Sequence, residues 1–75
     1  MTDGKVQAVL ALIAAELEIP QTRLDANSSI DTVPEWDSMA HLNICLAFQE
    51  RFGVTLDLEA IAAATSVPAL VALLK

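Results

Sequence analysis

A chain of 75 residues has room for one small domain with a single core, so we expect residues 1–75 to form one domain. Hydrophobic residues make up 55% of the chain, and ten acidic against four basic residues give a formal net charge of −6 at pH 7. This charge argues against nucleic acid as a partner, because phosphate binding needs clustered Lys and Arg.

The sequence also argues against a membrane span and an internal disulfide. It contains no run of about 20 apolar residues, which a membrane-spanning helix needs. Residues 1–4 lack the basic and apolar regions of a secretory signal peptide, which predicts a cytoplasmic location. The single cysteine, Cys45, has no disulfide partner within the chain and agrees with a reducing compartment.

The first predicted element is a helix over residues 3–18, which we expect to serve the core alone. Pro20 ends it, because the residue before a proline is disfavoured in the α-helical region. One face carries apolar side chains at the spacing of a 3.6-residue helix: Val6, Val9, Leu10, Ile13 and Leu17.

Residues 20–37 are predicted to form a long connector without regular structure. A loop of this length in a compact domain is often functional. Its apolar points, Leu24, Ile30 and Val33, should pin it to the helices. Trp36 is the only tryptophan, and we expect it to anchor the end of the loop where the next helix begins.

A second long helix is predicted over residues 38–52. It must begin after Pro34, and both Asp37 and Ser38 are strong N-cap residues. The carboxylate of Asp37 also suits the positive end of the helix dipole. Gly53 is well placed to end this helix. By itself, an Asp-Ser pair at this point predicts only a helix cap.

This second helix has two apolar faces. One face should point to the core and carries Ile44, Cys45, Phe48 and Phe52. The other face, nearly opposite, carries Met39, Leu42 and Leu46. The helices of so small a protein can hardly surround it, so we expect these three side chains to be exposed and to form a docking surface beside Ser38.

A short third helix is predicted from a cap at Asp57 to about Ala63. Its small side chains should let neighbouring backbones approach closely around Leu58 and Ile61.

The last helix should be capped by Thr65 or Ser66, with Pro68 in its first turn. Its inward face carries Val67, Leu70, Val71 and Leu74. The sequence therefore predicts an all-α fold: a small up-and-down four-helix bundle with a long loop between the first two helices and a short third helix.

The pattern from Trp36 to Gly53, W-D-S-M-x-H-L-x-x-x-L-x-F-x-x-x-F-G, resembles the attachment site and second helix of acyl carrier proteins. The resemblance extends over the whole chain in length, element order and loop placement. It implies that the Ser38 hydroxyl, preceded by Asp37, bears 4′-phosphopantetheine from coenzyme A through a phosphodiester. It also implies that the second helix meets partner enzymes beside this cofactor.

The resemblance further implies a chain that is not an enzyme but a monomeric substrate of enzymes. A phosphopantetheinyl transferase would attach the arm, and other enzymes would load and transfer an acyl or aminoacyl group held as a thioester. Ala40 and Asn43 occupy positions that are often acidic in carrier proteins of fatty-acid biosynthesis. A specialised lipid, polyketide or other secondary pathway is therefore at least as well supported.

Two other binding functions remain open. A peptidyl or aminoacyl carrier is one, although the Gly-Gly-His-Ser type of lead-in is absent and Trp36-Asp37 stands in its place. A helical adaptor without a cofactor, binding through Met39, Leu42 and Leu46, is the other.

A catalytic function is a weaker hypothesis. Asp37, Ser38 and His41 could suggest a hydrolase triad, but residues within one helical turn rarely form the required chain of hydrogen bonds. We expect His41 to pack between loop and bundle or to lie near the phosphate. Cys45 should point to the core and be inert, and no residues have the spacing of a metal site.

Overall fold

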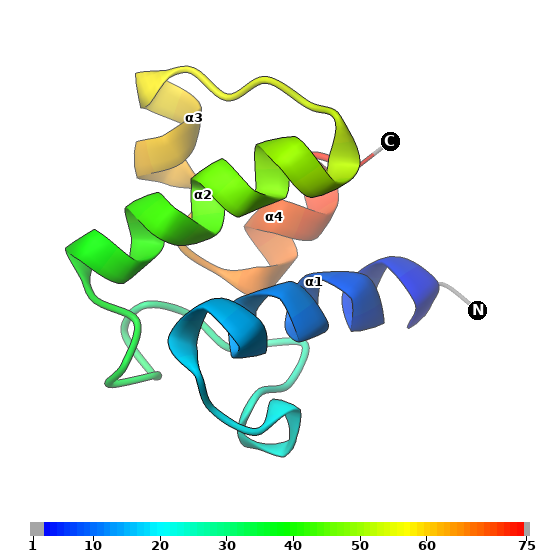
Figure 1. Cartoon of the computed structure of the whole chain (residues 1–75), viewed down its shortest axis with the longest axis vertical. Helices are drawn as coiled ribbons and strands as arrows, with labels where there is room; N and C mark the ends of the chain where they lie inside the picture. The colour runs from blue at the N-terminus through cyan, green and yellow to red at the C-terminus, as the bar shows by residue number, and fades with distance from the viewer. Residues whose placement is uncertain (1–2, 75) are drawn as a thin grey trace.

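The computed structural model describes residues 3–74 and confirms the predicted all-α fold. Its α-helices are α1 (Asp3–Leu17), α2 (Ser38–Phe52), α3 (Leu58–Ala63) and α4 (Val67–Ala72). Figure 1 shows the two long helices, α1 and α2, running side by side, with the short α3 standing across the first half of α2. The first helix, α1, packs against both α2 and α4. No helix within residues 3–74 has the length and apolar character needed to cross a membrane.

The core lies where α1, α2 and α4 meet. The predicted inward faces are confirmed at their central positions, and Leu12 and Ala14 of α1 are buried as well. The ring of Phe48 lies 4.9 Å from that of Phe52 between centroids, which extends the core to the end of α2. The fully buried side chains of these helices are Val9, Ile13, Ile44, Cys45, Phe48, Val67 and Leu70.

The connector between α1 and α2 is pinned as predicted, with Leu24 and Val33 buried and Ile30 packed at the edge of the core. It also contains a short 3₁₀ turn, η1 (Gln21–Arg23), which the sequence did not indicate.

Backbone hydrogen bonds join the middle of this connector to the start of α4. The Ile30 N–H donates to the Thr65 carbonyl at 2.9 Å, and the Val67 N–H donates to the Ser28 carbonyl at 2.9 Å. Together they form an isolated antiparallel bridge between Ser29 and Ser66. The loop is therefore tied to a segment far along the chain, which fixes its path toward Ser38.

The two short helices begin at side-chain caps. Asp57 accepts from the Ala60 N–H at 2.8 Å, and Ser66, rather than Thr65, accepts from the Ala69 N–H at 3.2 Å. The close approach expected around Leu58 and Ile61 does not extend to Leu58, which opens α3 and is 83% exposed, whereas Ile61 is partly buried against the core.

Gly53 ends α2 as predicted, in the left-handed conformation with φ 67° and ψ 30°. Its N–H donates to the Gln49 carbonyl at 2.9 Å. A residue with a side chain would be strained at this φ, although a Cβ atom at this position would have no other atom within 4 Å.

We expect Gly53→Ala to lower the free energy of unfolding by about 1 kcal/mol, because alanine disfavours positive φ. Gly4→Ala is the matched control, since Gly4 is helical and a Cβ there also meets nothing within 4 Å. That change should raise stability by roughly 0.5 kcal/mol. Urea denaturation measures both, and equal effects of the two substitutions would contradict this account of the helix end.

Candidate functional site

Ser38 is the first residue of α2, and its side chain is exposed. Asp37 caps the helix from an extended backbone, with its carboxylate accepting from the Ala40 N–H at 2.8 Å. The Asp37 carbonyl accepts from the His41 N–H at 2.8 Å, which starts the helical ladder. Asp37 therefore caps the helix, and the Ser38 hydroxyl, which is not needed for capping, lies at the surface.

Two backbone donors at this helix end remain available. The Asp37 N–H donates to the Glu35 carbonyl and the Ala40 N–H to the Asp37 carboxylate. Within residues 3–74, the N–H groups of Ser38 and Met39 donate to no protein acceptor. Free N–H groups at the positive end of a 15-residue helix favour an anion. A phosphodiester on the Ser38 oxygen would therefore meet compatible surroundings.

Trp36 fixes the loop immediately before Ser38. Its side chain is only 1% exposed, and its indole N–H donates to Nδ1 of His41 at 3.0 Å. The expectation that this tryptophan anchors the loop is confirmed.

His41 lies between loop and bundle, the first of the two placements expected for it. It is buried, and its ring is engaged at both nitrogens, Nδ1 with Trp36 and Nε2 with the Ile61 carbonyl of α3 at 2.7 Å. The Asp37 carboxylate is occupied by the Ala40 N–H rather than by His41. These contacts do not form the serine, base and carboxylate chain that a hydrolase triad needs.

An exposed ion pair joins the beginning of the connector to its end. Arg23 of η1 bonds both carboxylate oxygens of Glu35, with Nη2 donating to Oε1 at 2.9 Å. The hydrogen bond from Arg23 lowers the pKa of the Glu35 carboxyl, and the same bond raises the pKa of Arg23. Exposed pairs stabilise a fold little, so this one mainly fixes the path of the loop. The two residues are 12 apart in sequence, and no short-range pattern pointed to their pairing.

A family model described as the phosphopantetheine attachment site matches residues 7–74 of the chain. The chain belongs to this family. Its members carry 4′-phosphopantetheine covalently, which makes this a carrier domain that works with cofactor-attaching and acyl-handling enzymes. A search among curated proteins found no match.

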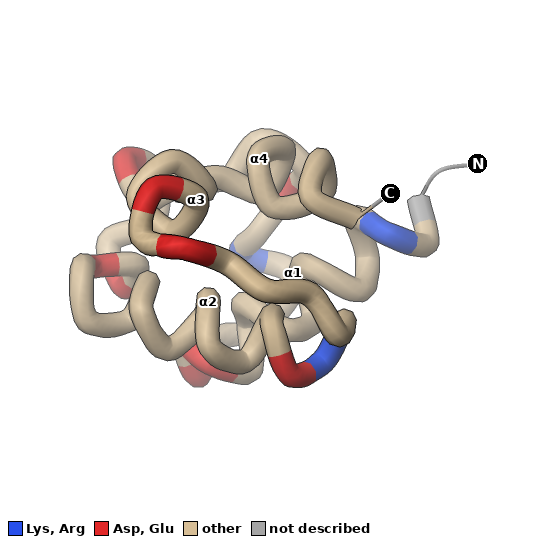
Figure 2. Tube along the Cα trace, turned by 90° about the horizontal axis from the view of Figure 1, so that it is seen from above, with Lys and Arg blue, Asp and Glu red and all other residues tan. Residues whose placement is uncertain are grey.

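The second face of α2 in this carrier domain is exposed as expected. Met39 is 72% exposed, Leu42 49% and Leu46 50%, although all three are large apolar side chains. We call these three residues the α2 outer face. Figure 2 shows Asp and Glu at separate places along the chain, including α3. Close to Ser38, the apolar α2 outer face lies beside the exposed acidic residues Glu35 and Asp37.

Cys45 lies in the core rather than at the surface beside Ser38. The Cys45 side chain is buried, and burial raises the pKa of its thiol, which keeps it protonated and inert. No group of three or more potential metal ligands occurs within residues 3–74.

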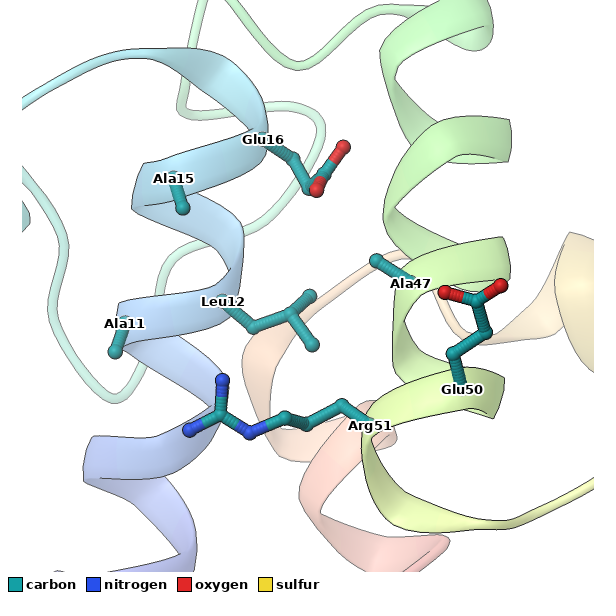
Figure 3. Close-up of a pocket in the computed structure, with 7 residues that line it drawn as sticks. All are labelled: Ala11, Leu12, Ala15, Glu16, Ala47, Glu50 and Arg51. Carbon is teal, nitrogen blue, oxygen red and sulfur yellow. The ribbon is translucent and has the colours of Figure 1, made fainter.

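A groove of about 370 Å³ lies between α1 and α2. Its α2 residues belong to the second half of that helix, whereas Ser38 opens the first turn. Figure 3 shows the Glu16 and Glu50 carboxylates and the Arg51 guanidinium around an alanine-rich surface. The residues that line it are Ala11, Leu12, Ala15, Glu16, Ala47, Glu50 and Arg51.

The cap at Asp37 gives a direct test of this helix start. We expect Asp37→Ala to lower the free energy of unfolding by about 1 kcal/mol, because the Ala40 N–H loses its acceptor. Asp37→Asn keeps a side-chain oxygen for this bond and should stay close to the wild type. Urea denaturation compares the two variants, and an equal loss in both would show that the charge rather than the oxygen matters.

Proposed function

We propose that the chain is an acyl carrier protein in which Ser38 bears 4′-phosphopantetheine and residues 1–75 act as one carrier domain. The observation that carries the proposal is the exposed Ser38 hydroxyl at the N-terminus of α2, inside the region that matches the family. When bound, the cofactor supplies a terminal thiol on which an acyl or aminoacyl group is held as a thioester.

The residues of the chain present the serine and do not activate it. The Ser38 oxygen forms the ester bond to the phosphorus of coenzyme A that carries the pantetheine arm, while the diphosphate P–O bond breaks and adenosine 3′,5′-bisphosphate leaves. The N–H groups of Ser38 and Met39 lie where they favour the negative charge of the resulting phosphodiester. The imidazole of His41 is occupied by Trp36 and Ile61, so it does not serve as a base for Ser38. The proton of the hydroxyl therefore goes to a base of the transferase, and the carrier is a substrate of enzymes and not itself an enzyme.

Partner enzymes dock on the α2 outer face in this proposal. Met39 follows Ser38 directly, and Leu42 and Leu46 continue the same side of the helix. Burying such exposed apolar side chains on association favours binding, and methionine adapts its shape to different partners. A surface beside the cofactor lets one face serve successive enzymes.

The chemistry of this face favours a specialised pathway. Asn43 is exposed, and neither it nor Ala40 provides the negative charge common in carriers of fatty-acid biosynthesis. We propose partners with neutral or apolar contact surfaces, as in lipid or polyketide-type secondary metabolism. The exposed carboxylate of Glu50, on the same helix, leaves room for a basic group at the edge of such a contact.

Ser38→Ala should abolish the increase in intact mass that coenzyme A and a phosphopantetheinyl transferase produce, because the accepting oxygen is gone. Ser29→Ala is the matched control, since Ser29 is another serine of the same loop region and should leave the mass increase intact. Intact-protein mass spectrometry reads both. A wild-type chain that remains unmodified with several transferases would count against the carrier function, and it would favour the adaptor without a cofactor.

Leu42→Ala should raise the KM of a transferase or partner enzyme for the carrier about fivefold while leaving kcat close to that of the wild type, because it removes about half of the buried side chain's contribution. Leu58→Ala removes another exposed leucine, on α3, and is the control for general loss of apolar surface. Steady-state kinetics with varied carrier concentration separate the two parameters. An unchanged KM for Leu42→Ala would remove the α2 outer face from the proposal.

A further inference from the structure

The contacts of His41 connect three segments of the chain around Ser38. Trp36 lies two residues before Ser38, His41 lies three residues after it, and Ile61 belongs to α3. The indole N–H of Trp36 bonds Nδ1 of His41 at 3.0 Å, and Nε2 of His41 bonds the Ile61 carbonyl at 2.7 Å. Residues 36–41 therefore form a short segment around Ser38 whose two ends are joined by a hydrogen bond. We call the two hydrogen bonds of His41, to Trp36 and to the Ile61 carbonyl, the clasp, and the second of them also holds α3.

The two partners fix the tautomer of this histidine. An indole N–H can only donate, so Nδ1 must accept, and the ring proton must sit on Nε2. Nε2 then donates to the Ile61 carbonyl, which can only accept. The sulfur of Cys45, 3.6 Å from Nε2, is a weaker neighbour. A neutral imidazole in one tautomer thus satisfies both hydrogen bonds in a buried place, and no alternative arrangement of the ring does so.

The third helix is only partly buried. None of its side chains is fully buried and Leu58 at its start is 83% exposed, while Ala60 and Ile61 are partly buried against the core. Its approach from α2 is set by the bond from the Leu56 N–H to the Gln49 side chain at 2.7 Å. Elements with little buried surface open easily, so the bond from His41 to the Ile61 carbonyl adds to this partial burial in holding α3.

We propose that His41 is a positioning residue that couples α3 to the loop before Ser38, so that the serine and the third helix are held as one unit. The inference rests on the carrier function proposed above. It adds that a displacement of α3 changes the position of Ser38, because His41 bonds both α3 and Trp36. Loss of the clasp lets Trp36 and the backbone before Ser38 move, whereas the side chains of the α2 outer face are unchanged.

The kinetics of cofactor attachment distinguish a change in the orientation of the Ser38 hydroxyl from a change in how the transferase docks. A transferase that still binds the α2 outer face but meets a poorly oriented hydroxyl should show a lower kcat with little change in KM. A residue that only stabilises the fold would not move kcat while the protein remains folded.

The test compares Trp36→Phe, His41→Phe and the double variant with the wild type, using a phosphopantetheinyl transferase and coenzyme A. Each single change should lower kcat about fivefold, as expected for a lost hydrogen bond, with KM within about twofold. The double variant should be no worse than His41→Phe, because loss of the imidazole already removes both bonds, whereas Trp36→Phe removes only the first of them. His41→Gln, whose amide has one acceptor and one donor group, should recover part of kcat.

Hydrogen exchange provides a readout that does not depend on cofactor attachment. Amides of α3 should exchange faster in both Trp36→Phe and His41→Phe, while those in the middle of α1 keep their protection. Phe48→Leu is the control for general destabilisation, because Phe48 is fully buried on α2 but makes neither bond of the clasp. It should lower stability without changing kcat or the exchange of α3 selectively.

Unchanged α3 exchange in folded Trp36→Phe and His41→Phe would overturn the coupling, and so would an unchanged kcat or a Phe48→Leu variant that behaves like them. A wild-type chain that is never modified at Ser38 would instead overturn the carrier function. In that case the exchange of α3 amides still decides whether His41 links this helix to the loop.

Discussion

The burial of one face of α2 is the constraint on which the site depends. Ile44, Cys45 and Phe48 are fully buried against the rest of the bundle, and this fixes how the helix is rotated about its axis. Any other rotation would bring these side chains into water and lose several kcal/mol of apolar burial. With the rotation fixed, the α2 outer face must point to solvent, and Ser38 at the first turn is presented beside it.

The loop before Ser38 is long but held at several independent points. Leu24 and Val33 are buried, backbone bonds tie residues 28–30 to residues 65–67, and the Arg23–Glu35 pair closes its outer edge. Each contact alone is modest, yet together they restrict the path of the chain much more than its composition suggests. Ser38 is thus carried on a defined backbone, which suits the attachment site proposed for it.

The polar contacts within the fold are satisfied in a way that specifies one arrangement. Within residues 3–74, no buried side-chain nitrogen or oxygen lacks a hydrogen-bond partner. His41 is the clearest case, because burial of an imidazole costs free energy unless both ring nitrogens are bonded. Its two bonds need Trp36 and α3 in definite places, so a polar side chain contributes specificity where apolar packing around the small α3 is weak.

The sequence by itself determined the helices, their caps and the two faces of α2, because these features follow from local rules. Gly53 ends α2, Asp37 and Asp57 act as caps, and apolar residues recur at the helical period. The exposure of Met39, Leu42 and Leu46 followed from the same periodicity together with the short length of the chain. Only the tertiary structure decided the bridge between Ser29 and Ser66, the Arg23–Glu35 pair, the exposure of Leu58 and the role of His41 between Trp36 and Ile61. These contacts join residues that no period or motif relates, since their partners become neighbours only after the helices have packed.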